Sequence, residues 1–174
     1  MKNLWIATVL ILIAACSTKK TMPEAPASPD ATAKLLMGKN WLVTRTGTLS
    51  PFQMDNKTSY DWLDEMKDAD DFIKKTLGEM ATLQIKFVND TLVNVTGLKD
   101  APLEQKYGVV AGGEEDLSTV KLEFSYYGTD PFGGTEKMDL TYSYPVLGIN
   151  ENTFLLATPR SVNERKIVLM MEVK

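Results

Sequence analysis

The chain has 174 residues, with 19 Lys and Arg against 23 Asp and Glu, a formal charge of −4 and no histidine. The acidic balance disfavours nucleic acid as a partner, and the lack of imidazole removes the commonest general base and the commonest transition-metal ligand. The single cysteine excludes an internal disulfide and a zinc site built from several thiolates.

The first 15 residues have the layout of a secretory signal peptide. Lys2 supplies one early positive charge, an apolar stretch runs from Leu4 to Ile13, and the small residues Ala14 and Ala15 stand before Cys16. A membrane-spanning helix needs about 20 apolar residues, roughly twice this stretch, so a permanent single-pass anchor is the weaker interpretation.

Residues 13–16, Ile-Ala-Ala-Cys, resemble the lipobox of bacterial lipoproteins. The resemblance implies that residues 1–15 are a lipoprotein signal peptide, cut off directly in front of Cys16, and that the Cys16 thiol receives a diacylglycerol. Several acyl chains on one cysteine make a stable membrane anchor, which explains a lone cysteine in a secreted chain. By resemblance to Gram-negative lipoprotein sorting, Ser17 is compatible with the outer membrane, and the lack of an acidic run at Thr18, Lys19 and Lys20 favours the side that faces the periplasm.

Residues 16–34 contain three prolines and many small or polar side chains, without apolar periodicity. This composition predicts a flexible linker after Cys16, the residue that the lipobox resemblance implies is lipidated. Residues 35–174 then number about 140, the common size of one domain with a substantial core. We therefore expect a single domain after the linker.

Eight segments of this domain alternate apolar and polar side chains, which predicts half-buried strands. A three-residue turn at 89–91 would pair Phe87 with Val93 and Ile85 with Val95, and would keep the apolar side chains on one face. That face must be interior. The predicted strands are 39–47, 81–88, 91–97, 105–112, 120–127, 137–144, 153–158 and 165–173.

One segment, 58–78, has apolar residues at helical spacing, with Thr58 or Ser59 as a cap and Gly78 at its end. It lies between the first two predicted strands. The sequence therefore predicts a mainly β domain: an eight-stranded antiparallel up-and-down barrel with one α-helix inserted between strands 1 and 2. Closure of the barrel removes exposed strand edges.

Residues 35–41, with Gly38 and Trp41 near the first strand, resemble the opening of the lipocalin-like lipoproteins of Gram-negative bacteria. The resemblance implies a lipocalin-like barrel, with Trp41 packed across its closed end and a small hydrophobic ligand inside. An eight-stranded barrel either holds one ligand or is filled by its own side chains, and both outcomes stay open. The candidate ligand-binding residues are Phe87, Phe124, Tyr126, Tyr142 and Tyr144.

Other motifs are weaker. Residues 114–116, Glu-Glu-Asp, predict a solvated loop, with a calcium site as the alternative. Asp64, Asp68 and Asp71 predict an exposed helix face, and no carboxylate spacing supports a glycosidase. Ser118 and Lys121 match an S-x-x-K motif, but side chains three apart on a strand point to opposite faces. We expect no catalytic residues, no metal site and no cofactor.

The sequence thus predicts a non-enzymatic lipoprotein of the Gram-negative cell envelope. Its partners would be the membrane, through the anchor on Cys16, and a small hydrophobic ligand. The alternative is a structural or interaction lipoprotein with a filled barrel. A third interpretation, a META-domain-like envelope protein, gives no reason for the inserted helix.

Overall fold

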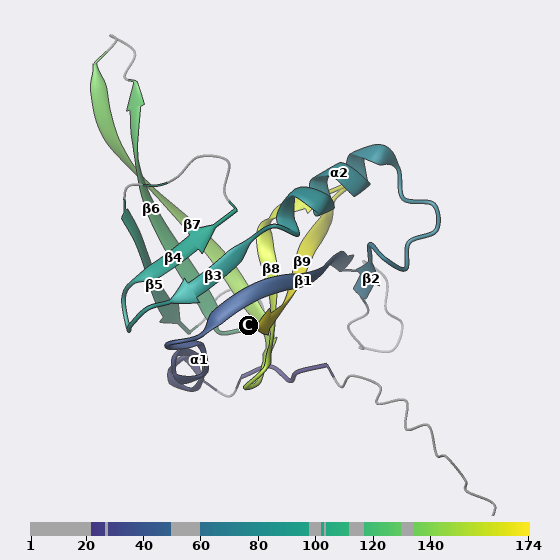
Figure 1. The fold of residues 1–174 in the computed structure, drawn as a ribbon, viewed down its shortest axis with the longest axis horizontal. Helices are drawn as coiled ribbons and strands as arrows, with labels where there is room; N and C mark the ends of the chain where they lie inside the picture. Colours follow the sequence, from purple (N-terminus) through teal and green to yellow (C-terminus); the bar gives the residue numbers. More distant parts are fainter. Residues whose placement is uncertain are drawn as a thin grey trace, which may run out of the picture.

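The structure, a computed structural model, describes residues 22–26, 28–49, 60–97, 102, 104–111, 117–129 and 134–174. Within these residues the chain forms two helices and a nine-stranded antiparallel sheet (Figure 1). The helices are α1 (Pro29–Leu36) and α2 (Asp71–Met80). The strands are β1 (Asn40–Leu49), β2 (Tyr60–Trp62), β3 (Gln84–Phe87), β4 (Val93–Thr96), β5 (Glu104–Val110), β6 (Thr119–Thr129), β7 (Thr135–Ile149), β8 (Thr153–Val162) and β9 (Arg165–Val173).

Eight of these strands curl into a nearly closed up-and-down barrel, as predicted. Their order is β4-β3-β1-β9-β8-β7-β6-β5, and β2 pairs with β1 outside this path. The remaining seam, between β4 and β5, is bridged by Leu92 and Lys106, and the Tyr107 amide donates to the Thr91 carbonyl at 2.9 Å. This architecture is consistent with a calycin-like fold.

The alternating pattern predicted the strands well. All eight predicted strands are present, and β1, β6, β7 and β8 extend beyond their predicted ends. Phe87 pairs with Val93 and Ile85 with Val95, which confirms the predicted register of this hairpin. The hydrophobic separation of the two sheet faces is therefore sufficient to set the alignment of β3 and β4.

The barrel is sealed at the end where α1 lies. Trp41 is fully buried and its ring lies 5.5 Å from that of Phe154, so its predicted role in the core is confirmed. The turn after α1 is fixed to β3, because the Gly38 amide donates to the Phe87 carbonyl at 2.9 Å. Leu36, at the last position of α1, is also fully buried in the core. We call this region the α1 end; Figure 1 shows α2 across the opposite end.

Helix α1 corrects the predicted linker, which is wrong for residues 29–34. The Ser28 hydroxyl caps the helix by accepting from the Ala31 amide at 3.2 Å, and Pro29 stands in the first turn. Ser and Pro are common in linkers but are equally typical of a helix start, where a proline lacks only an amide that needs no partner. The composition of 16–34 was therefore ambiguous.

The residues before α1 also lie against the barrel. Pro23 is buried, and the Glu24 carbonyl accepts from the Ile149 amide of β7 at 3.0 Å. Gly148 allows this close approach, because a Cβ there would collide with the Pro23 carbonyl. We call residues 22–26 the docked segment.

The predicted helix over 58–78 is too long at its start. The helix begins at Asp71, after Asp70, whose carboxylate accepts from the Ile73 amide at 2.8 Å, and it continues past Gly78 to Met80. Upstream, Tyr60 and Trp62 belong to β2, where the chain runs antiparallel to β1. Tertiary pairing with β1 overrides the helical spacing of these aromatic residues.

Trp62 packs on the outside of the barrel, against Leu155, Val168 and Met170. Arg45 covers it: the guanidinium carbon lies 4.7 Å from the Trp62 ring centroid. The same guanidinium pairs with Asp64 at 2.7 Å and with Glu65 at 2.6 Å. Asp64 thus lies in a turn and binds an arginine, Asp68 lies before α2, and Asp71 is an exposed residue of its first turn.

Candidate functional site

The five predicted ligand residues all face the barrel interior, but they belong to two different environments. Phe87 lies at the α1 end and is only 1% exposed. Its ring centroid is 4.7 Å from that of Tyr107 and 6.5 Å from that of Phe154. Phe87 is therefore packed among aromatic side chains of the core.

The other four residues form one inner wall, which we call the β6–β7 wall. Phe124 is buried, with its centroid 5.8 Å from Tyr142 and 6.4 Å from Tyr126. Tyr144 lies opposite Val120 in the same ladder. The three tyrosines pack against the core cluster but are only partly buried. This wall is the part of the predicted set that stays accessible.

The Tyr144 hydroxyl of the wall stays protonated at neutral pH. Burial, together with the nearby Tyr142 and Tyr126, raises the pKa of Tyr144 to about 12, although the Arg160 charge acts in the opposite direction. A protonated phenol can donate a hydrogen bond and accept one. The wall therefore combines apolar rings with phenol hydroxyl groups.

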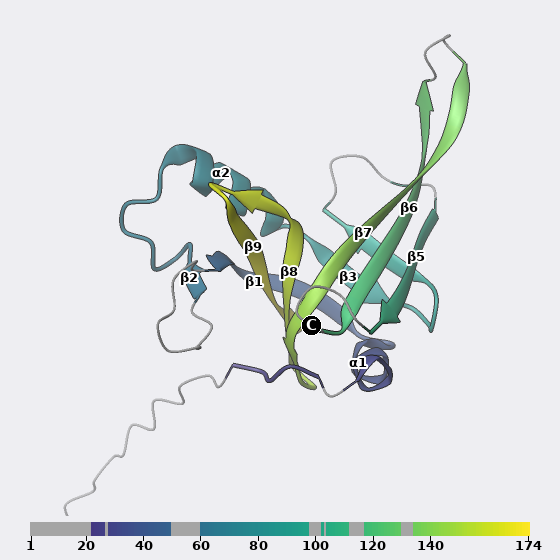
Figure 2. The same cartoon turned by 180° about the vertical axis from the view of Figure 1, so that it is seen from behind.

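The wall is accessible because the sheet divides beside it. Among the described residues, β7 pairs with β8 only from Val146 to Ile149, so the earlier part of β7 diverges from β8. Figure 2 shows this part of β7 leaving the barrel together with β6. Leu140 and Met138 pair with Phe124 and Tyr126 and continue the same face, with 41% and 46% of their surface exposed.

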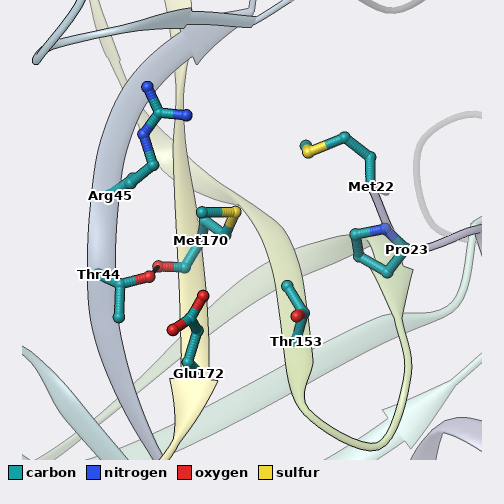
Figure 3. Close-up of a pocket in the computed structure, with 7 residues that line it drawn as sticks. All are labelled: Met22, Pro23, Thr44, Arg45, Thr153, Met170 and Glu172. Carbon is teal, nitrogen blue, oxygen red and sulfur yellow. Dashed lines mark hydrogen bonds between the residues drawn. The ribbon is translucent and has the colours of Figure 1, made fainter. Parts of the chain in front are cut away.

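A separate hollow of about 300 Å³ lies outside the barrel, between the docked segment and strands β1, β8 and β9 (Figure 3). Met22 and Pro23 stand on one side of it, and Met170 and Arg45 on the other. Its size is at the lower limit of small-molecule pockets. Two of its polar side chains are already engaged, since Arg45 is held by two carboxylates and the Thr44 hydroxyl donates to the Met170 carbonyl at 3.3 Å. The sequence carried no signal for it, since it depends on where the docked segment lies.

A smaller hollow of about 140 Å³ lies between strands β5, β6 and β7 and is lined mostly by polar and charged side chains. Lys137 pairs with Glu104 there at 3.3 Å, and the Ser125 hydroxyl donates to Asp139. These groups satisfy one another, so we assign this hollow no binding role.

Several predicted features lie outside the described residues, namely the signal peptide 1–15, Cys16, Ser17, the helix cap at Thr58 or Ser59 and the acidic loop 114–116. In the described part of the chain, no group of three or more His, Cys, Asp or Glu side chains is placed to hold a metal ion. Neither described helix has the length and apolar character needed to cross a bilayer.

The fold and the wall define a class of protein: a nearly closed up-and-down β-barrel with one sealed end and a partly exposed aromatic inner wall. No family model matches the chain, and no curated protein or solved structure is significantly similar to it.

Proposed function

We propose that this protein is a lipocalin-like, lipid-anchored protein of the cell envelope that binds a small hydrophobic ligand against the β6–β7 wall. The observation that carries the proposal is the incomplete burial of Tyr126, Tyr142 and Tyr144, three inward-facing aromatic side chains of a barrel whose α1 end is tightly packed. Large aromatic side chains normally bury most of their surface in a core.

The chemistry of the wall suggests the class of ligand. Rings supply apolar contact area, and a few polar groups fix orientation in most small-molecule sites. Phe124 supplies the floor, and the Tyr142 and Tyr144 hydroxyls can bond a polar group of the ligand. A planar or lipid-like molecule with one hydroxyl or carbonyl fits this combination.

The membrane anchor of the proposal is Cys16, with residues 1–15 as the signal peptide that is removed. The proposed place is the outer membrane of a Gram-negative bacterium, on its periplasmic side, as the lipobox-like residues and Ser17 suggest. A ligand carrier held there would exchange lipophilic molecules close to a bilayer.

The second candidate is a structural or interaction protein with a filled barrel. It is favoured by the packing of Phe87, Tyr107 and Phe154, and by the exposed side chains of Met138 and Leu140. In that case the aromatic wall would be the edge of the hydrophobic core. The surface that binds a partner would then lie on the outside of the barrel.

The test begins with Cys16→Ser in a chain whose residues 1–15 are replaced by a secretory signal peptide that is cleaved without a cysteine, which we expect to move the protein from the membrane fraction to the soluble fraction. Native mass spectrometry of this soluble variant, followed by solvent extraction, should then detect a stoichiometric lipophilic adduct. Tyr142→Trp should abolish the adduct by enlarging the wall. Tyr127→Trp is the matched control, because Tyr127 is 67% exposed on the other face of β6.

A bare protein mass, unchanged after incubation with a lipid extract, would refute the carrier function and favour the filled barrel. Equal loss of the adduct in both tryptophan variants would place the ligand away from the β6–β7 wall. Membrane retention of the Cys16→Ser variant would contradict the anchor.

A further inference from the structure

The outer part of the β6–β7 hairpin projects well beyond the barrel (Figures 1 and 2). We call residues 126–129 and 135–143 the arm. Its β7 residues 135–141 are all exposed, and β5 pairs with β6 only as far as Ser125. Within the described chain, the β7 edge of the arm therefore lacks a strand partner.

Such a two-stranded ribbon lacks the packing and strand pairing that would stabilise it. A two-stranded hairpin without further packing is marginally stable in water, and an unpaired strand edge presents backbone groups that can bind another strand. The apolar face of the arm is also uncovered at Met138 and Leu140. A strand added to the β7 edge would supply both hydrogen bonds and apolar contact.

The sequence of β7 fits a second copy of itself. If two β7 edges pair antiparallel about Leu140, Met138 lies opposite the partner's Tyr142, and both belong to the apolar face. On the other face, Lys137 lies opposite the partner's Ser143 and Asp139 opposite the partner's Thr141. Over residues 137–143 no like charges oppose each other, and polar and apolar residues stay on separate faces, as stable strand pairs require. Beyond them, Glu136 lies on the apolar face, opposite the partner's Tyr144.

We propose that two copies of the chain dimerise through the β7 edges of their arms, in antiparallel register about a two-fold axis at Leu140. The contact is isologous, so each residue pair occurs twice and the assembly closes at two chains. The result is a four-stranded ribbon that joins two barrels. The proposal does not rest on a ligand at the β6–β7 wall, but it places the partner's Met138 beside Tyr142 of that wall.

Disulfide trapping tests the register in the full chain in its own membrane. Directly opposed side chains have Cβ atoms about 5 Å apart, so Leu140→Cys should form a disulfide-linked dimer under mild oxidation. Met138→Cys is the matched control: it lies on the same face with similar exposure, but about 14 Å from its own copy in this register. We expect at least about tenfold more dimer from Leu140→Cys, since only its geometry permits the bond.

A second measurement guards against misfolding of the Leu140 variant. Cells that express Met138→Cys together with Tyr142→Cys should give a crosslinked pair of these two chains, since the register places the two positions opposite each other. Equal crosslinking of the Leu140 and Met138 variants, or none in the mixed cells, would overturn the proposal. A crosslink to a different protein would overturn it as well and would assign the edge to another partner.

Discussion

The α1 end and the β6–β7 wall are built from the same alternation of apolar and polar residues, yet they are packed differently. Trp41, Phe87 and Phe154 at the α1 end are almost completely buried, whereas Tyr126 and Tyr142 on the wall are only partly so. Alternation therefore predicts which way a side chain points, but not whether other side chains cover it. Whether an inward-facing side chain is covered by others depends on which strands stay paired at that point of the barrel.

The largest expected effect is on the free energy of unfolding, which should differ between substitutions in these two regions. Phe87→Ala should lower the free energy of unfolding by about 3–5 kcal/mol, because it leaves a cavity in a packed aromatic cluster. Urea unfolding measures this loss. Tyr142→Ala, on the accessible wall, should cost clearly less, and equal losses would contradict the contrast between the two regions.

An intermediate effect is expected where the docked segment covers the outside of the barrel. Gly148→Ala should cost about 1–3 kcal/mol, because the new Cβ forces the Pro23 carbonyl away from β7. Thermal unfolding and limited proteolysis near residues 22–26 would detect the change. Gly108→Ala is the control, since a Cβ there meets nothing within 4 Å. A cost for Gly108→Ala as large as that for Gly148→Ala would show that the docked segment is not the cause.

The smallest effect concerns the pH dependence of the wall. The pKa of Tyr144 is raised from 10.0 to about 12, so the folded protein keeps this proton at pH values where the unfolded chain has lost it. Its contribution to stability is complete below pH 10 and declines as the pH rises through about 12. Denaturant unfolding from pH 9 to 12 should show the wild type losing stability relative to Tyr144→Phe. A constant difference between the two proteins would mean that the hydroxyl is solvated.

Much of the barrel could be predicted because each strand carries its own period-two pattern, and the β3–β4 register followed from four apolar residues. Helix α1 could not, because Ser28 and Pro29 are as typical of a linker as of a helix start. The start of α2 was misplaced because Tyr60 and Trp62 have helical spacing but pair with β1 through a contact that the local sequence does not encode.

The candidate site was predictable only in part. The inward direction of Phe124, Tyr126, Tyr142 and Tyr144 followed from alternation, and the structure groups them on one wall. Their accessibility depends on the point where β7 parts from β8, after the last shared pair at Val146. That separation is a tertiary feature without a local residue signature.

The docked segment also limits the length of the connection between Cys16 and the barrel. If Cys16 is the anchor, as proposed, the connection from it to the docked segment at Met22 spans at most about 20 Å when fully extended. A linker that was free up to residue 34 could have reached about three times as far. The barrel would therefore stay close to the lipid headgroups. The short connection would limit how far the barrel can move from the bilayer to reach a distant target.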